Sequence, residues 1–555
     1  MRRSFFTLLL CSFTLLARGN DYEFEQKQYL EIFTNVCREL SIYYVDTIHP
    51  EKMIRTGIGA MLNTLDPYTN YIPEENMEDF ELMTTGEYGG IGALISKREE
   101  GVYISEIYEG TPSMKAGLLP GDIFLRIDSV DVTKKNQSEV SKLLRGGNNT
   151  LISVEVKREG TEGTIKKQFQ RKKVSLPSVP YYGIVGDNIG YIKLTSFTEK
   201  SAEEVRSAFS TLKKRDSIKG LILDLRDNPG GVVESAVRIV SLFVPKGSPV
   251  LSMRGKVQQF DKTYTTNQEP MDDKIPLAVL INEESASASE IVAGAVQDLD
   301  RGVLFGTHSF GKGLVQISRP LPYNGVLKLT SAKYYIPSGR CIQAIDYFHK
   351  KTDGSVENVP DSLIHEFKTL KNGRIVKDGR GLLPDVEVKE REVPDIVYQL
   401  ARENIIFDYA TQYYFKHKTI PSPSKFSLSE EEYREFKQFV KSKKFSYKRR
   451  SEDLLDKIQE IMKMEKVSKT TDSVFVELKK SLKMDIDRDL ETFKKDIKFG
   501  IEMAICTRYY YTAGVIEHNL RSDEQLQKVL HMIKYPESFL HILSKDYKPN
   551  NVEKK

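Results

Sequence analysis

The chain has 555 residues, of which 39% are hydrophobic, so it exceeds what one hydrophobic core usually accommodates and is expected to fold as several soluble domains. Its net charge of +4 is small for this length and gives no reason to expect nucleic acid as a partner. The 8 histidines are scattered without ligand spacing, so neither a metal site nor another cofactor is predicted.

The first 19 residues have the pattern of a secretory signal peptide. Arg2 and Arg3 precede an apolar run from Phe5 to Leu16, and Ala17-Arg-Gly19 forms a small-x-small cleavage site. An uncleaved anchor is the alternative, but the run is short for a membrane span. We therefore expect an exported, extracytoplasmic protein, which in a Gram-negative cell means the periplasm.

Asp21 to Leu65 is predicted to be helical. Apolar residues recur there at helix-face spacing, and they include Tyr29, Ile32, Phe33, Val36 and Leu40. This region either packs on the rest of the chain or pairs two subunits, and the sequence leaves both open.

A glycine-rich segment follows, in which Gly89, Gly90 and Gly92 flank Ile91. Successive backbone N–H groups can converge there on a carboxylate, while the strand that follows can accept an added peptide strand. Residues 138–144 predict a short helix that forms the other wall of this groove.

Further motifs along the same segment resemble a PDZ domain, namely Gly110-Thr-Pro112, Ala116-Gly-Leu118 and Pro120-Gly-Asp-Ile123. The alternative is a small β domain with glycine turns and no ligand. A PDZ domain would capture the C-termini of proteins or peptides.

Strands and helices alternate from Tyr181 to Val388, with strands expected over Gly190–Leu194 and Pro276–Ile281 and a helix over Ser201–Leu212. Between them, Gly220 begins a buried apolar strand.

That strand ends in a turn containing Gly230 and Gly231, which can present backbone N–H groups closely. The alternative is an ordinary strand-to-helix connection, in which glycine permits a positive φ.

A serine-rich turn opens the next predicted helix, which runs from Ala286 to Ala295. Ser285, Ser287 and Ser289 compete for the role of a nucleophile beside unpaired N–H groups, or they merely cap the helix.

Lys312 lies downstream of these serines and is flanked by two glycines. A serine needs a neighbouring base to attack an amide, and a lysine can be that base only when burial keeps it neutral. Serine–lysine pairs are a known variant of the catalytic triad. Gln316 could orient the amine by a hydrogen bond.

The last portion, from about residue 390, is rich in lysine and glutamate and is predicted to be helical. Pro421-Ser-Pro423 is expected to be a linker, and Ser429 with Glu432 forms a capping box before an apolar helix face. No catalytic constellation is visible there.

Three segments together resemble the carboxyl-terminal processing peptidases, or tail-specific proteases. They are Leu223-Asp-Leu-Arg-Asp-Asn-Pro-Gly-Gly231, Ser285-Ala-Ser-Ala-Ser-Glu-Ile291 and Phe310-Gly-Lys-Gly313 with Gln316. The resemblance covers roughly residues 55 to 390. It implies that Ser287 is the nucleophile and Lys312 the base. Gln316 then corresponds to the glutamine that accompanies this pair in the family.

The same resemblance implies an oxyanion hole formed by the backbone N–H of Ala288 and by one N–H from Gly230 or Gly231. It implies a multidomain α+β fold, in which an α/β (ClpP/crotonase-like) protease core carries an inserted PDZ-like domain and helical terminal regions. The expected parts are a signal peptide (1–19), a helical N-terminal region (20–85), a PDZ domain (86–173), a protease core (174–390) and a helical C-terminal domain (391–555).

The resulting hypothesis is a secreted serine endopeptidase that cuts near the C-termini of proteins held by its PDZ domain, without a cofactor or metal. An adaptor protein and a homo-oligomer remain open as partners. One alternative is a noncatalytic binding protein of the same fold. Another is a serine protease with His308 as its base, which is disfavoured because no triad-like partner pattern accompanies that histidine.

Overall fold

The computed structural model describes residues 2–351, 354–466 and 472–547. Its contacts divide the chain into two compact units. The first consists of the described residues of 1–74, 316–330 and 347–356, and the second of the other described residues.

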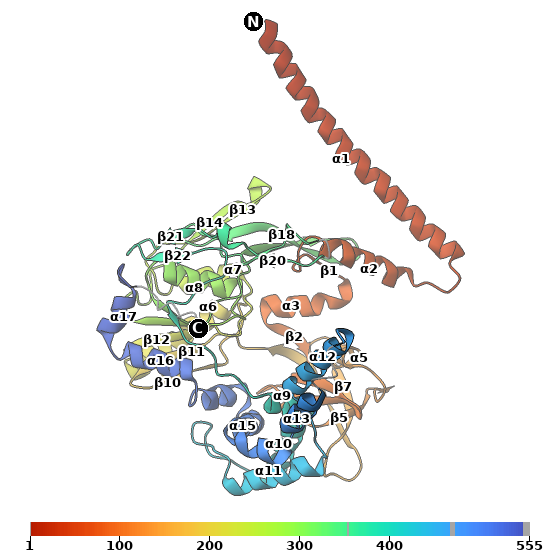
Figure 1. Cartoon of the computed structure of the whole chain (residues 1–555), viewed down its shortest axis with the longest axis vertical. Coiled ribbons are helices and arrows are strands. Elements are labelled where there is room, and N and C mark those ends of the chain that lie inside the picture. Colours follow the sequence, from red (N-terminus) through yellow and green to blue (C-terminus); the bar gives the residue numbers. More distant parts are fainter. Residues whose placement is uncertain (1, 352–353, 467–471, 548–555) are drawn as a thin grey trace. The chain divides into compact units, whose positions relative to one another are not determined.

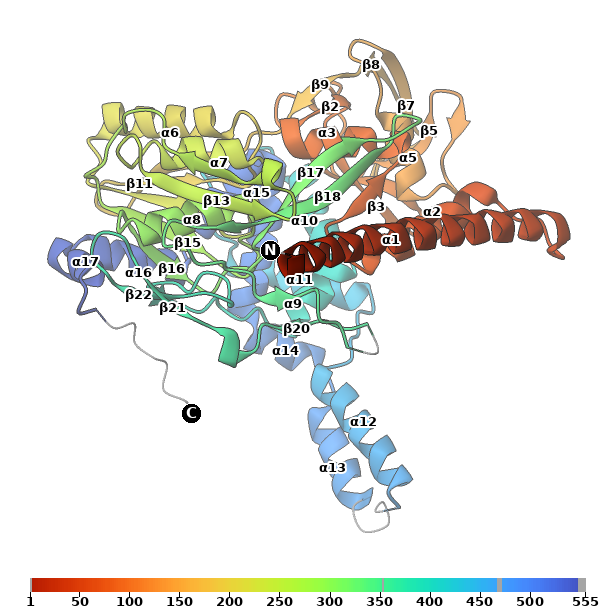
Figure 2. The same ribbon diagram turned by 90° about the horizontal axis from the view of Figure 1, so that it is seen from above.

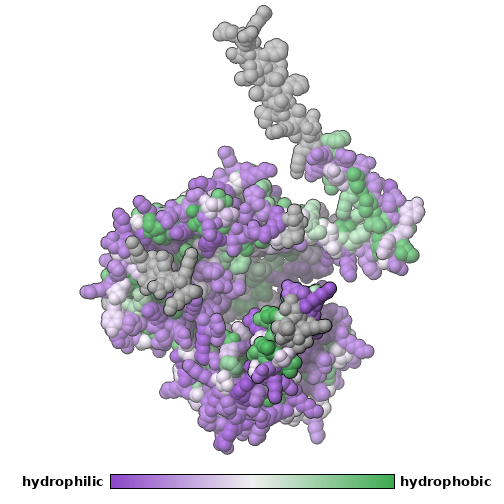
Figure 3. Space-filling view, viewed as in Figure 1, coloured by the Kyte–Doolittle hydropathy of each residue, from purple (hydrophilic) through white to green (hydrophobic). Residues whose placement is uncertain are grey.

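The first unit begins with two helices, α1 (Arg2–Tyr43) and α2 (Pro50–Asn63), in agreement with the predicted helical period. Pro50 is the first residue of α2, where its missing N–H costs no hydrogen bond. Hydrophobic side chains gather along α1 and are exposed (Figure 3), including Tyr29 and Val36. Among the described residues, no helix is long and apolar enough to cross a bilayer.

The second unit contains a β domain with its own hydrophobic core. Its sheet has the order β3-β4-β5-β7-β8, β6 pairs with β5, and β2 pairs with β9. The elements are α3 (Met77–Thr85), β2 (Glu87–Gly90), β3 (Ala93–Arg98), β4 (Gly101–Ile107), α4 (Pro112–Lys115), β5 (Ile123–Ile127), β6 (Val130–Asp131), α5 (Gln137–Leu144), β7 (Leu151–Lys157), β8 (Ile165–Gln170) and β9 (Lys172–Ser175). The predicted helix over residues 138–144 is confirmed as α5.

A six-stranded sheet forms the centre of a second domain in this unit (Figure 1), with the order β10-β11-β12-β15-β16-β23. Its strands run parallel except β10, which is antiparallel to β11. The strands are β10 (Tyr181–Val185), β11 (Ile189–Lys193), β12 (Gly220–Asp224), β15 (Leu277–Ile281), β16 (Val303–Gly306) and β23 (Val386–Glu387). The predicted strands are thus confirmed to within a residue or two.

Helices cover both faces of this sheet, because alternate side chains of each buried strand point to opposite sides. Leu221 and Leu223 pack with α6 (Ser201–Asp216), α7 (Val233–Val240) and α8 (Ala288–Asp298). On the other face, Ile222 and Leu280 pack with α16 (Glu524–Ile533) and α17 (Pro536–Ile542). The last two helices of the chain therefore complete the core around this sheet.

The other C-terminal helices share a separate core. They are α9 (Asp395–Arg402), α10 (Ile405–Lys416), α11 (Glu430–Ser442), α14 (Ile486–Thr492) and α15 (Lys494–Asn519). The capping box of Ser429 and Glu432 is confirmed at the start of α11. Helices α12 (Arg450–Met464) and α13 (Asp472–Leu482) lie side by side (Figure 2).

The prediction that Pro421–Pro423 is a linker is wrong. The segment lies in the loop between α10 and α11, where Ile420 and Phe426 are buried in the core that these helices share. His518 contacts the carbonyl oxygen of Pro423 at 3.0 Å. The two prolines therefore shape a packed loop within one domain.

Short strands and turns complete the fold. Within the first unit, β1 (Asn70–Ile72) pairs with residues 326–328, and within the second, β13 pairs with residues 332–335. The remaining elements are η1 (Glu74–Asn76), β13 (Pro249–Gly255), η2 (Gln258–Phe260), β14 (Lys262–Thr265), β17 (Leu314–Pro320), β18 (Val326–Tyr335), β19 (Ile345–Asp346), β20 (Glu357–Asn358), η3 (Asp361–Leu363), β21 (Glu366–Lys368) and β22 (Ile375–Lys377).

Candidate active site

Ser287 lies at the N-terminus of α8 in a backbone conformation that non-glycine residues rarely adopt, with φ +56° and ψ −111°. Such strain persists only where the surroundings enforce it, and it clusters at functional sites. The hydroxyls of Ser285 and Ser289 donate to the carbonyl oxygens of Leu225 and Asn228, both at 2.8 Å. Two of the three serines therefore fix the loop that follows β12, which favours Ser287 as the nucleophile.

Lys312 is half-buried in the loop between β16 and β17. Its flanking residues, Gly311 and Gly313, have φ of +79° and +64°. A Cβ on Gly311 would lie 2.4 Å from the Cβ of Ala344, and a Cβ on Gly313 would lie 2.6 Å from the Cβ of Gln343. The glycines thus allow this loop to pass tightly against residues 343–344 and carry the lysine.

Glu290 joins the two predicted catalytic segments. Its carboxylate is fully buried, and its Oε2 accepts from the backbone N–H of Ser287 at 2.9 Å and of Lys312 at 3.1 Å. Its Oε1 accepts from the Ser309 hydroxyl at 2.6 Å and the Gly311 N–H at 2.7 Å. One carboxylate therefore brings Ser287 and Lys312, 25 positions apart in the sequence, to the same place.

The environment of Glu290 is electrostatically unusual. Burial raises its pKa above the usual value, although hydrogen bonds from Ser309, Gly311, Lys312 and Ser287 act in the opposite direction. The Tyr334 hydroxyl also donates to Oε2, at 3.2 Å. The sequence did not predict that Glu290 joins the serine turn to the lysine loop. The available signal was the Ser-x-x-Glu spacing of a capping box, which accounts for the bond to Ser287 but not for the bonds to the lysine loop.

Residues 225–231, the loop after β12, pack directly against the serine turn. A Cβ on Gly230 would lie 2.6 Å from the carbonyl oxygen of Ala286 and 2.8 Å from the backbone nitrogen of Ala288. The N–H of Gly230 is donated to Asn228 Oδ1 at 2.9 Å. The N–H groups of Gly231 and Ala288 have no acceptor among the described residues. Of the two glycines, Gly231 is therefore the one with an N–H to offer.

The other predicted side chains have different surroundings. Gln316 donates from Nε2 to Thr330 Oγ1 at 3.2 Å, and both residues belong to the first unit, so its predicted role beside the lysine stays a prediction. His308 contacts the Ser309 carbonyl at 3.0 Å and Glu283 at 3.5 Å. Neither contact involves the side chain of Ser285, Ser287 or Ser289.

The β domain contains a groove of about 530 Å³, which β3 and α5 line together with Ile91 of the glycine-rich segment. Gly89 and Gly90 belong to β2, and Gly92 follows with φ +77°. The carbonyl oxygen of Gly92 accepts from the Ser113 hydroxyl at 3.0 Å, which fixes the turn. Ile91 is buried and lines the groove. Binding of a peptide by this segment stays a prediction.

Comparisons with known proteins find matches to three regions of the chain. Residues 188–347 match Peptidase family S41, residues 103–158 match a PDZ domain, and residues 396–533 match the probable PDZ-protease C-terminal helical domain. A carboxy-terminal-processing protease from Bartonella bacilliformis is 35% identical over 342 residues, which cover 61% of this chain and 78% of that protein.

Two solved structures are also similar. The photosystem II D1 C-terminal processing protease has 23% identity and a TM-score of 0.35, and the match covers 64% of this chain and 87% of that one. A peptide-bound PDZ domain of the carboxy-terminal protease from Vibrio cholerae has 24% identity and a TM-score of 0.16, over 16% of this chain and 99% of that one.

Proposed function

Because the chain belongs to peptidase family S41 and is a carboxy-terminal processing protease with a PDZ domain, we propose that it cleaves proteins near their C-termini with Ser287 as nucleophile and Lys312 as base. The observation that carries this proposal is the carboxylate of Glu290, which accepts from the backbone N–H groups of both residues. This arrangement supports a serine–lysine dyad.

In the proposed mechanism, Ser287 Oγ attacks the scissile carbonyl carbon while Lys312 Nζ takes up the hydroxyl proton. The carbonyl oxygen becomes an oxyanion, which accepts from the N–H groups of Ala288 and Gly231. Lys312 then returns the proton to the leaving amine, and the acyl group stays on Ser287. Water attacks this ester with Lys312 again as the base, and Lys312 passes the proton to Ser287 Oγ as the new C-terminus is released.

The groove between β3 and α5 supports capture of a substrate C-terminus. An added peptide strand can pair with β3, and the buried side chains of Ile91, Ile95 and Leu144 line the groove for an apolar terminal residue. The turn of Gly89, Gly90 and Gly92 would bind the terminal carboxylate.

The test is to incubate the purified protein with an unstructured protein that ends in an apolar residue and to locate the cuts by mass spectrometry. Cuts are expected near the C-terminus. An otherwise identical substrate with an amidated C-terminus should show a KM about tenfold higher, because charge-assisted hydrogen bonds to the carboxylate are lost. Cuts spread evenly along the chain, or equal KM values, would contradict selection by the C-terminus.

We further propose that the protein is exported and works in the periplasm, on the basis of the pattern from Arg2 to Gly19. In a Gram-negative host, the periplasmic fraction should contain a protein whose first residue is Asn20. Retention of residues 2–19 in a membrane fraction would instead indicate an uncleaved anchor.

A further inference from the structure

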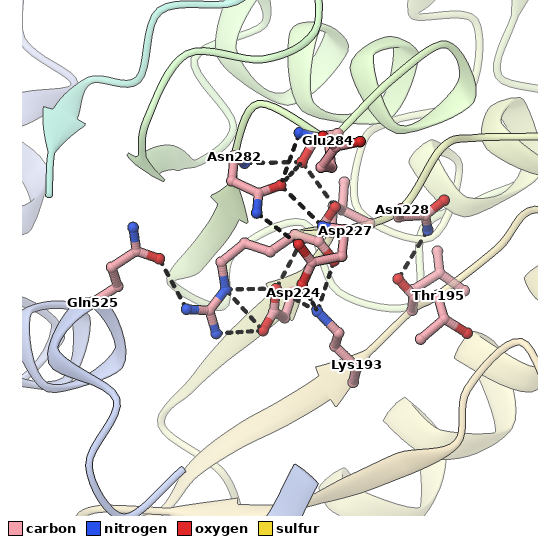
Figure 4. Close-up of polar contacts among 12 residues, drawn as sticks. Lys193, Thr195, Asp224, Asp227, Asn228, Asn282, Glu284 and Gln525 are labelled. Carbon is pink, nitrogen blue, oxygen red and sulfur yellow. Dashed lines mark hydrogen bonds and ion pairs between the residues drawn. The ribbon is translucent and has the colours of Figure 1, made fainter. Parts of the chain in front are cut away.

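The loop of residues 225–231 is held at its beginning by Arg226, whose guanidinium joins two distant parts of the chain. Its Nη2 donates to Asp224 Oδ2 and to Asp523 Oδ2, both at 2.6 Å, and its Nη1 donates to Gln525 Oε1 at 2.8 Å. Figure 4 shows two of these acceptors, Asp224 and Gln525. Asp224 ends β12, whereas Asp523 lies 297 residues after Arg226 and caps α16. The loop that offers the Gly231 N–H is thus tied to the C-terminal helices.

These charged groups are buried, so the free-energy cost of removing them from water must be offset by their contacts with one another. Burial acts to lower the pKa of Arg226, but Asp224 and Asp523 outweigh it and hold the pKa well above its usual value. Burial likewise opposes ionisation of Asp224, whereas the charges of Arg226 and Lys193 keep its pKa below the usual range. Loss of one partner from such a set leaves another charge buried without compensation.

The position of Arg226 is transmitted to the rest of the loop by hydrogen bonds. Lys193 Nζ donates to the Arg226 carbonyl at 2.7 Å, and the Asp227 N–H donates to Asn282 Oδ1 at 2.9 Å. Further along, the Asn228 carbonyl accepts from the Ala286 N–H at 3.0 Å, which joins the loop to the serine turn. A shift of Arg226 would therefore move the loop relative to Ser287.

The C-terminal partners are themselves firmly placed. Asp523 Oδ1 accepts from the Leu526 N–H at 2.9 Å as the cap of α16, which packs on the central sheet. Gln525 Nε2 donates to the Val388 carbonyl at 2.6 Å, and both Asp523 and Gln525 are buried. Two rigid acceptors are thus presented to one guanidinium.

We propose that Asp523 and Gln525 are positioning residues for peptide hydrolysis, because they hold Arg226 and thereby keep the Gly231 N–H directed at the oxyanion that forms over Ser287. The inference rests on the proposed function. An oxyanion donor acts mainly in the transition state, so its displacement lowers kcat and leaves substrate binding unchanged. The C-terminal region then contributes directly to the rate of the reaction.

The decisive variant is Asp523→Asn, which keeps the size of the side chain and can keep the cap of α16, since asparagine caps helices as well as aspartate does. If the oxygen of the introduced asparagine accepts from the Leu526 N–H, the amide NH₂ of the same side chain faces the Arg226 guanidinium. An NH₂ group is a donor and cannot accept a hydrogen bond from the guanidinium. We expect kcat to fall about 10- to 100-fold with KM unchanged, a loss typical of a misplaced or missing oxyanion donor.

The matched control is Asp496→Asn. Asp496 lines the same cavity as Asp523, but it pairs with Arg391 and does not contact the loop of residues 225–231. The kcat of Asp496→Asn should stay at the wild-type level.

A second measurement uses a peptide boronic acid, whose tetrahedral adduct mimics the oxyanion. It should bind Asp523→Asn more weakly by the same factor as the loss in kcat, while a product peptide binds with unchanged affinity.

Should Asp523→Asn fail to fold by circular dichroism, Gln525→Met is the second variant, because it removes a neutral acceptor of Arg226 together with the donor to the Val388 carbonyl and changes no charge. It should give the same change in kcat at constant KM. Unchanged kcat in a folded variant would overturn the inference. An equal loss in Asp496→Asn would also overturn it, because the effect would then come from general loosening of the cavity. A wild-type protein that cleaves no peptide would instead overturn the proposed function and the inference with it.

Discussion

Replacing Lys312 by alanine is expected to lower kcat by about 10⁴-fold or more, the loss typical when one member of a cooperating nucleophile–base set is removed. Without a base, the hydroxyl proton of Ser287 has no acceptor during attack. Lys312→Arg should be equally inactive, because a guanidinium stays protonated and cannot serve as a base. The measurement is the rate of cleavage of a peptide with an apolar C-terminus.

Folding of the variant is expected to be preserved, because Glu290 holds the loop through the backbone N–H of residue 312 rather than through its side chain. His308→Ala is the matched control, since its ring lies in the same loop but contacts Ser309 and Glu283. This control should cleave at the wild-type rate. Equal cleavage by wild type and Lys312→Ala would refute the dyad. Loss of activity in His308→Ala would support the alternative hypothesis that His308 is the base.

Local patterns were sufficient to predict most elements and to propose a catalytic pair of Lys312 with one of three serines. The buried strand at Gly220 and the helix after Ser287 depend on apolar runs and on capping, which the sequence displays directly. The resemblance to a known family then selected Ser287 among three serines. The structure adds a reason, since the other two hydroxyls are engaged with the loop of residues 225–231.

Contacts between distant segments could not be predicted in this way. Glu290 has the spacing of an ordinary capping residue, and its bonds to the lysine loop exist only because β16 brings that loop beside α8. The pairing of Arg226 with Asp523 depends in the same way on α16 packing against the sheet. The linker prediction for Pro421 and Pro423 is wrong because it depends on local composition, whereas the burial of their neighbours is a tertiary property.

Replacing Glu290 by alanine is expected to have the second large effect, on both stability and activity. It would leave the N–H groups of Ser287, Gly311 and Lys312 buried without their acceptor, and each such group costs about 1–3 kcal/mol. We therefore expect the free energy of unfolding to fall by at least about 3 kcal/mol, measured by urea denaturation. Peptide cleavage should fall by at least about 100-fold, because Ser287 and Lys312 lose their common anchor.

Glu290→Gln separates the charge of this residue from its shape. Glutamine offers one acceptor oxygen, and its NH₂ would face at least one of the N–H donors that Glu290 now accepts, so cleavage should still fall strongly although the volume is unchanged. Glu284→Ala is the matched control, because Glu284 is exposed in the same turn, and its stability should change by less than about 0.5 kcal/mol. Wild-type cleavage by Glu290→Gln would show that the turn and the lysine loop stay aligned without the carboxylate, and the carboxylate would then be dispensable for the dyad.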